Sequence, residues 1–446
     1  MRETEYLEAV TNQMRCKRAR NLVAEELGQH IQDQAAAYRE LGMGEEEALK
    51  KAVEQMGDPV SVGTDMDSIH RPETDRGTFF FICFMSVFGA FCWILLAGKN
   101  MPEDTSFWDI GAFVKLLFTG CLPGILFMWM VMRLDYTRIG RHPFAFALIL
   151  TGIMWGYNIW SGYPGNGKYG MNYLFLAFAL FLFGAAVHAM AGKGYKGIFL
   201  CLFWLFVQTV VFSVISRQPI NVCNFFLTGT IVMSIAAWKG WFGPARKKAL
   251  LSVWGSITVP AVFLLLAEAF ADGYRWRRIQ GWLLAADSEI NYLLSGIQKE
   301  AAGAGLLHGT GSRMAVHNQN EYFLISLIAQ HGYLAAFLVT ALFGVLAFRL
   351  LKGIAQAKNH LGILMGAAAV FSLMLPAFEH LLYNVGWIPA GSLVLPFFSA
   401  SGADVGLQGS YCTGAVLAYY AAMGICLSVY RIRNVVSKGR VCYENV

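Results

Sequence analysis

Charged residues are scarce in this sequence of 446 residues. Asp, Glu, Lys and Arg make up 14% of the chain, whereas about 25% is usual in soluble globular proteins. The apolar residues AVILMFWYC make up 56%, and 46 glycines come in addition. A chain this apolar cannot be a water-soluble enzyme of several domains, so that class of protein is excluded.

The nine cysteines lack the spacing of a disulfide framework or a zinc site. No two of them form a CxxC pair, and most lie in apolar runs, which favours buried thiols in a reducing or lipid setting. The sequence also lacks a phosphate loop, a nucleophile elbow and a dinucleotide fingerprint. We therefore expect no metal site, and the sequence indicates no cofactor.

The charges that are present divide the chain into two parts. Residues 1–75 contain 9 Lys/Arg and 16 Asp/Glu, whereas residues 76–446 contain 26 Lys/Arg and 13 Asp/Glu. The first part is charged throughout, so it contains no signal peptide and should stay in the cytoplasm. We predict a cytoplasmic helical domain over 1–75 and a membrane domain over 76–446.

The cytoplasmic part has the periodicity of short amphipathic helices. Apolar positions recur at helical spacing within 6–14 and 22–35, and a third helix begins after Gly44 and stops at Gly57–Asp58–Pro59. About 70 residues in such helices bury only a small core, which indicates a docking or sensing module and not an enzyme. Its acidic balance argues against binding of nucleic acid.

Apolar runs that are long enough to cross a membrane follow Arg76. A hydrocarbon core of about 30 Å requires roughly 17–25 helical residues. The sequence therefore predicts an all-α polytopic membrane protein with about ten transmembrane helices. They are expected at residues 78–98, 110–132, 143–160, 172–191, 197–215, 219–238, 249–271, 322–349, 361–383 and 406–430.

The basic residues of the connecting loops predict the orientation of these spans. With the N-terminal part inside, the short cytoplasmic loops hold twelve Lys/Arg, against Lys99, Lys168 and Arg217 in the short external loops. Basic residues are enriched in cytoplasmic loops, so both termini should be cytoplasmic. Two external segments, 272–320 and 384–405, are too long or too rich in Pro and Gly for simple connectors. We expect them to build the functional site.

Three stretches of the C-terminal half carry a family resemblance. They are NYLLSGIQKEAAGAGLLHGTG at 291–311, HNQNEYFLISLIAQHG at 317–332 and NVGWIPAGSLVLPFFSASG at 384–402. Together they resemble the FtsW/RodA/SpoVE family, also called SEDS proteins, which are ten-span membrane proteins of bacterial division, elongation and sporulation. The N-terminal strings YLEAV, HIQDQ, GMGEEEALKKAVEQMGDP and SIHRP resemble the HAAS or permease-prefix helical domain.

The SEDS resemblance implies a peptidoglycan glycosyltransferase that polymerises lipid II at the outer face of the bacterial cytoplasmic membrane. It also implies a class B penicillin-binding protein as partner. The family's catalytic aspartate falls on Glu321, which adds one methylene. Substrate-binding roles are expected for Arg275, Arg277, Arg278, Lys168, Gln298, Asn384, Pro396 and Ser399.

Each of these expectations has an alternative. Glu321 would also suit the positive end of a helix dipole. Arg275, Arg277 and Arg278, which flank Trp276, would also suit an anchor at the lipid headgroups. Glu379 and His380 lie next to the Pro/Gly segment, where an interhelical hydrogen bond is the simpler role.

Two other functions stay open. A non-catalytic SEDS-like scaffold of a cell-wall complex is favoured by Glu321 and by residues 166–169, where the family's basic motif is largely absent. A lipid flippase or transporter would fit the permease-prefix resemblance. Transporters usually have broken helices in both halves of the chain, and only the C-terminal half has such an interruption.

Overall fold

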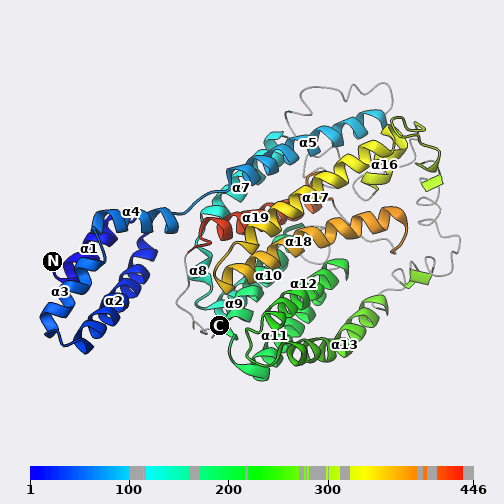
Figure 1. Cartoon of the computed structure of the whole chain (residues 1–446). Coiled ribbons are helices and arrows are strands. Elements are labelled where there is room, and N and C mark those ends of the chain that lie inside the picture. Colours follow the sequence, from blue (N-terminus) through cyan, green and yellow to red (C-terminus); the bar gives the residue numbers. More distant parts are fainter. Residues whose placement is uncertain are drawn as a thin grey trace.

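The computed structural model describes most of the chain. The described residues are 1–100, 114, 117–160, 170–215, 219–270, 276–277, 279–280, 298–299, 301–311, 322–388, 395–398 and 409–434. Every regular element within them is helical, so the prediction of an all-α fold is confirmed. Figure 1 shows a small group of helices beside a larger bundle, with the α4–α5 connection between them.

The N-terminal residues form four helices, one more than predicted. They are α1 (Glu3–Gln13), α2 (Lys17–Glu40), α3 (Glu45–Gln55) and α4 (Pro59–His70). The unpredicted helix begins at the signal that ends α3, because the Asp58 side chain accepts a hydrogen bond from the Ser61 N–H at 2.9 Å. Pro59 occupies the first helical position, where its missing N–H costs nothing.

The remaining helices form the membrane body. They are α5 (Arg76–Asn100), α7 (Leu122–Arg133), α8 (Tyr136–Ile139), α9 (Pro143–Trp160), α10 (Gly170–Ala189), α11 (Gly194–Ile215), α12 (Pro219–Trp238), α13 (Arg246–Phe270), α16 (Phe323–His331), α17 (Tyr333–Ala355), α18 (His360–Val385) and α19 (Gly409–Arg431). Within the described residues, eight helices are long and apolar enough to cross a membrane, and α7 and part of α19 are shorter apolar helices. The body is therefore membrane-integral.

One predicted span differs from the structure. We expected a single helix over 322–349, but the chain breaks at Gly332 into α16 and α17, and α17 continues to Ala355. Gly332 has φ 88° and ψ 174°, a backbone conformation that is open almost only to glycine. The apolar run continues across the glycine, so hydropathy alone does not reveal the break.

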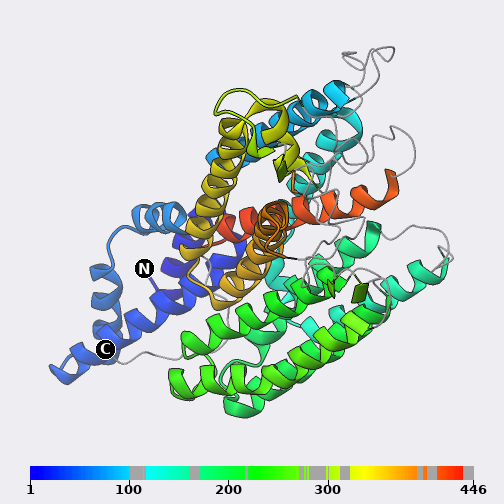
Figure 2. The ribbon, with the colours of Figure 1, turned by 90° about the vertical axis from the view of Figure 1, so that its right-hand side faces the viewer.

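The centre of the body consists of α10, α18 and α19. Helix α10 packs closely on α18, because Gly184 has no side chain to separate it from the Leu364 carbonyl. Helices α11, α12 and α13 pack together on one flank, and α5, α16 and α17 lie on the other (Figure 1 and Figure 2). Helix α18 has 26 residues, which is long enough to cross the membrane from one face to the other.

The basic loops meet on one face, which we call the cationic face. It comprises residues 134–142, 190–194, 239–245 and 356–359 together with the end of α19. The Gly192 N–H donates to the Trp241 carbonyl at 2.9 Å, and the Trp241 ring stacks on His360 with centroids 4.1 Å apart. The Lys358 N–H donates to the Arg433 carbonyl at 2.9 Å. The positive-inside rule predicts that this face is cytoplasmic.

Two residues just after α19 tie the four N-terminal helices, which we interpret as a domain, to the cationic face. Arg433 donates to Glu73 at 2.7 Å, and Asn434 donates to the Ile69 carbonyl at 2.6 Å. The hydrogen bond from Arg433 lowers the pKa of Glu73. The N-terminal domain and the end of α19 are therefore on the same face of the bundle, as predicted for two cytoplasmic termini. Which side of the membrane this face occupies stays a prediction.

Candidate functional site

The opposite face is organised around the break at Gly332. The segment 305–306 lies against the first turn of α17, where the Tyr333 N–H donates to the Gly305 carbonyl at 3.2 Å. The Leu334 N–H donates to the Leu306 carbonyl at 3.0 Å. The first N–H groups of a helix have no partner within the helix, so this segment satisfies two of them.

Residues 310 and 311, a few positions further along, cap the end of α16. The Gly311 N–H donates to the Ala329 carbonyl at 3.1 Å, and the Thr310 hydroxyl donates to the same oxygen at 3.3 Å. A glycine-rich stretch can bring its backbone this close to another helix because few side chains intervene. The GAGLLHGTG sequence therefore packs against the junction of α16 and α17 and provides hydrogen-bond partners for both helix ends.

Asn384 joins α18 to the start of α16. Its side-chain oxygen accepts from the Ile325 N–H at 3.1 Å, and its amide nitrogen donates to the His380 carbonyl at 2.7 Å. Its side chain is buried, with the residue 5% exposed. Ile325 is the third residue of α16 and its N–H has no partner within that helix. Asn384 thus positions the start of α16, and its predicted contact with substrate stays a prediction.

Gln298 reaches the same point from the long external segment. Its amide nitrogen donates to the Asn384 carbonyl at 3.3 Å. Gly386 ends α18 with φ 85°, and a Cβ added there would lie 2.8 Å from the Gln298 nitrogen. The predicted Asn-x-Gly motif therefore ends the helix and leaves room for Gln298.

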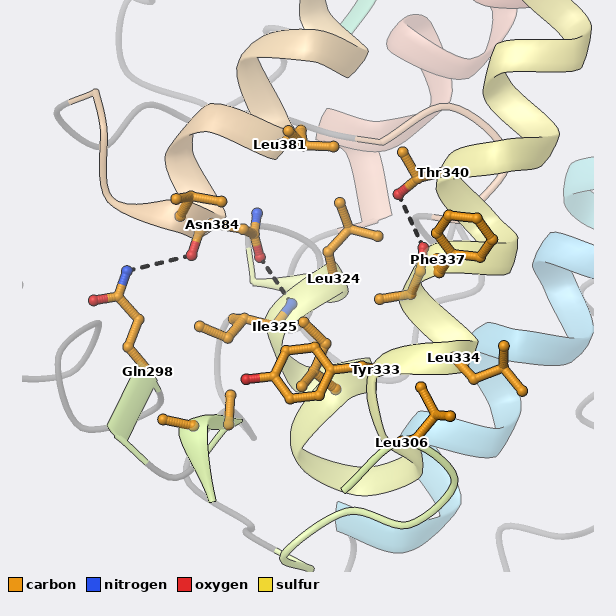
Figure 3. Close-up of a pocket in the computed structure, with 15 residues that line it drawn as sticks. Gln298, Leu306, Leu324, Ile325, Tyr333, Leu334, Phe337, Thr340, Leu381 and Asn384 are labelled. Carbon is orange, nitrogen blue, oxygen red and sulfur yellow. Dashed lines mark hydrogen bonds between the residues drawn. The ribbon is translucent and has the colours of Figure 1, made fainter. Parts of the chain in front are cut away.

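A cavity of about 850 Å³ opens beside these residues. Figure 3 shows Gln298 and Asn384 at one end of it, with Leu334, Phe337 and Thr340 of α17 at the other. Its wall is mostly apolar and is formed by Gln298, Ala301, Ala302, Leu306, Leu324, Ile325, Ile328, Tyr333, Leu334, Ala336, Phe337, Thr340, Leu381, Asn384 and Val385. Phe337 is 68% exposed and Val385 is 53% exposed, so the cavity opens to the surroundings of the body.

Glu321 itself lies outside the described residues, but the residue after it is firmly held. Tyr322 is 2% exposed, and its ring lies 5.4 Å from that of Tyr383, centroid to centroid. Ala301 and Ile325 belong to the same small apolar cluster. The chain therefore leaves Glu321 and enters a packed region at the rim of the cavity.

Comparison with known proteins finds similar folds but no similar sequences. No family model and no curated protein matches this sequence. One chain of a peptidoglycan synthase complex, solved in work on how polymerisation and cross-linking are coordinated, aligns over 81% of this chain and 98% of its own length. The TM-score is 0.58 and the sequence identity is 16%.

This chain has the fold of that synthase subunit. At 16% identity this similarity is one of fold. Two crystal structures of the rod shape determining protein RodA of Thermus thermophilus also align over 81% of the chain at 15% identity, one of them an aspartate-to-alanine variant. They are covered over 97% and 98% of their lengths, with TM-scores of 0.49 and 0.48.

The structure describes only some of the predicted basic residues. Arg277 is exposed, and its neighbour Trp276 stacks on Phe270 at the end of α13 with centroids 4.6 Å apart. Such a ring contact suits the interfacial anchor that we considered as the alternative. Arg275, Arg278, Lys168 and Ser399 lie outside the described residues, as Glu321 does, so their roles stay predictions.

Pro396 belongs to a short segment that lies inside the protein. Leu395 and Pro396 are buried, and the fully buried Phe398 packs on the rings of Phe323 and Phe343. Non-helical backbone is tolerated at membrane depth when protein surrounds it. Pro396 therefore has a packing role in the structure, and contact with substrate stays a prediction.

Glu379 forms the interhelical hydrogen bond that we considered for it. The Asn224 amide donates to its carboxylate at 2.7 Å, which joins α12 to α18. His380, its neighbour, is fully buried in α18.

The cavity also contains residues that sequence reasoning missed. Tyr333, Phe337 and Thr340 line it from one face of α17, and Leu306 lines it from the glycine-rich segment. The helical spacing of the three α17 residues was visible in the sequence. It becomes informative only once Gly332 is known to start a new helix.

Proposed function

We propose that this protein is a SEDS-type peptidoglycan glycosyltransferase that polymerises lipid II at the outer face of the bacterial cytoplasmic membrane. One observation carries the proposal: an apolar cavity of about 850 Å³ beside Tyr322, in a fold shared with a peptidoglycan synthase subunit. The residue before Tyr322 is the carboxylate Glu321, at the position of the family's catalytic aspartate.

A lipid-linked sugar donor requires both an apolar groove and polar groups at one end of it. Leu324, Ile328 and Phe337 give the cavity a wall for the polyprenyl chain, and Gln298 lies at its polar end. Burial of apolar chain surface contributes about 25 cal/mol per Å². The lipid chain would thus provide much of the binding free energy and leave the sugar at the membrane surface.

The proposed reaction transfers a glycosyl group between two lipid-linked sugars. The acceptor hydroxyl oxygen bonds to the anomeric carbon of the donor, while the bond from that carbon to the pyrophosphate oxygen breaks. Glu321 takes the proton from the hydroxyl group as general base. The basic residues Arg275, Arg277, Arg278 and Lys168 neutralise the departing polyprenyl pyrophosphate.

A class B penicillin-binding protein is the proposed partner, because the similar fold was solved within a synthase complex. The alternative function is a scaffold for such a complex. It is favoured by the loss of the family's basic motif at 166–169 and by the longer side chain of Glu321. A scaffold would bind the partner but would transfer no sugar.

The test is polymerisation of fluorescent lipid II by the purified chain, with and without its class B penicillin-binding protein. Ala302→Trp fills the exposed rim of the cavity and should raise KM for lipid II more than it lowers kcat, because it obstructs binding. Leu307→Trp is the matched control, since Leu307 is exposed and does not line the cavity. A partner complex that forms but makes no polymer would support the scaffold instead.

A further inference from the structure

A second cavity lies at the cationic face, away from the proposed catalytic site. Its volume is about 710 Å³, and it lies between α5, α17 and α19. These helices pack side by side in the body, with α17 between the other two. Its wall is formed by Asp75, Thr78, Ala341, Gly344, Val345, Phe348, Arg349, Lys352, Gly353, Gln356 and Tyr430.

The wall changes in character along α17. Ala341, Val345 and Phe348 line its deeper part, and Arg349, Lys352 and Gln356 follow toward the cationic face. At 1.5 Å per residue, the lining residues of α17 extend over about 22 Å. One leaflet of a bilayer has about 15 Å of hydrocarbon, so the cavity extends over the leaflet and its headgroups.

The wall of the cavity contains two cations, Arg349 and Lys352, and one carboxylate, Asp75. Arg349 lies over the Phe81 ring at 5.4 Å, and neither Arg349 nor Lys352 takes part in the ion pairs of the described residues. Asp75 is the acidic residue in the wall. Its carboxylate already accepts from the N–H and the hydroxyl of Thr78, at 2.9 and 2.6 Å. These hydrogen bonds leave the charge of Asp75 in place, so the lining has a net charge of +1, which favours an anionic ligand.

We propose that this cavity binds one anionic phospholipid of the cytoplasmic leaflet. The lipid phosphate would interact with Arg349 and Lys352, and an acyl chain would lie along Ala341, Gly344 and Phe348. A Cβ added at Gly344 would have no neighbour within 4 Å, so the groove has free space at that point. Basic pockets between transmembrane helices on the cytoplasmic side are suited to anionic lipid headgroups.

The proposal explains two features that catalysis does not use. Arg349 and Lys352 are exposed basic residues on α17. The positive-inside rule explains why basic residues lie on this side of the membrane, but not why these two line a cavity. Tyr430 lines the cavity, and the Arg433 guanidinium lies over its ring, 4.1 Å from the centroid. The bound lipid would thus lie next to the residue that ties the N-terminal domain to the body.

The experiment uses the full chain in detergent, stripped of lipid and titrated with phosphatidylglycerol or with phosphatidylcholine of the same acyl chains. The midpoint of thermal unfolding reports binding, because a ligand of the folded state raises it. We expect phosphatidylglycerol to act at about 5- to 30-fold lower concentration, since each of the two basic residues contributes roughly 1 kcal/mol. Inorganic phosphate at the same concentrations should have no effect.

Two variants separate the headgroup from the acyl chain. Arg349→Gln with Lys352→Gln should abolish the preference for phosphatidylglycerol over phosphatidylcholine. Lys247→Gln with Lys248→Gln, in the first turn of α13 next to the cationic face, should keep it. Gly344→Leu should weaken both lipids, because it fills the groove without changing the charge. An unchanged preference in the Arg349/Lys352 variant would overturn the proposal. Equal stabilisation of the wild-type chain by inorganic phosphate would also overturn it, since a free anion would then suffice.

Discussion

The side-chain oxygen of Asn384 accepts a hydrogen bond from the backbone N–H of Ile325 over 3.1 Å. The last turn of α18 therefore caps the first turn of α16, a short helix whose own sequence provides no side-chain cap. The cap comes from a residue 59 positions away in the chain. Tyr322 is the N-cap residue of α16, so this contact also fixes the position of the residue that follows Glu321 in the sequence.

Replacement of Asn384 by alanine should disturb the proposed site through α16. It leaves the Ile325 N–H without a partner, and an unsatisfied buried N–H costs about 1–3 kcal/mol of stability. We expect a lower unfolding midpoint together with a reduced polymerisation rate per folded molecule. Asn158→Ala is the control, because Asn158 forms buried hydrogen bonds with Asn172, between α9 and α10. Equal rates in the two variants would contradict the positioning role.

Gly332→Ala should destabilise the junction of α16 and α17. A residue with a Cβ is strained at φ 88° and ψ 174°, and such strain costs about 1–3 kcal/mol. The added atom would also lie 2.7 Å from the Gly305 carbonyl. Thermal unfolding in detergent should show a lower midpoint for Gly332→Ala but not for Gly255→Ala, which replaces a glycine of α13 with open space around it. A midpoint equal to the wild type would show that the break needs no glycine.

The ion pair between Glu73 and Arg433 should make docking of the N-terminal domain depend on pH. Arg433 holds the pKa of Glu73 below its ordinary value of 4.5. A lowered pKa stabilises the docked state at pH values above 4.5, and this contribution is lost as the pH falls through the lowered pKa. Docking should thus be constant near neutral pH and weaken under acid conditions.

Hydrogen exchange of residues 71–76 would measure this tether. Glu73→Gln should accelerate exchange there at neutral pH and remove the acid-dependent change. The effect should be modest, since the Glu73 side chain is 41% exposed to solvent. Glu45→Gln, which removes an exposed ion pair with Arg39 inside the N-terminal domain, is the control. If both variants exchange alike, Arg433 does not hold the domain.

The orientation of the cationic face can be tested with reporter fusions. A reporter at Gly303 should be external, and reporters at Ala245 and at the C-terminus should be cytoplasmic, because basic loops are retained inside. The structure places Ala245 on the cationic face and Gly303 beside the cavity of the opposite face. A cytoplasmic reporter activity at Gly303 would reverse the orientation.

The long spans could be predicted from sequence because lipid imposes length and apolarity on each helix separately. The break at Gly332 could not, since apolar residues continue on both sides of it and only the backbone conformation differs. The helix after Asp58 was missed for a related reason: Asp58–Pro59 ends one helix and begins the next. The local sequence shows that a helix boundary is present at Asp58–Pro59, but not whether a new helix begins there.

The candidate site was only partly predictable because it combines distant segments. Gln298 and Asn384, both inferred from the SEDS resemblance, meet across 86 positions of the chain. The apolar residues Leu306 and Phe337 look like ordinary loop and lipid-facing residues until the fold brings them to one cavity. Pro396, inferred in the same way, is buried next to Phe398, and its contact with substrate stays a prediction.

The most direct test of the proposed function is the initial rate of lipid II polymerisation by Glu321 variants in complex with the partner. Glu321→Gln removes the proton acceptor at nearly constant volume and should lower the rate by about 10²- to 10⁴-fold, with an unchanged unfolding midpoint. Glu321→Asp, which restores the residue of the SEDS family, should keep polymerising. A Glu321→Gln protein that polymerises lipid II at the wild-type rate would contradict the account.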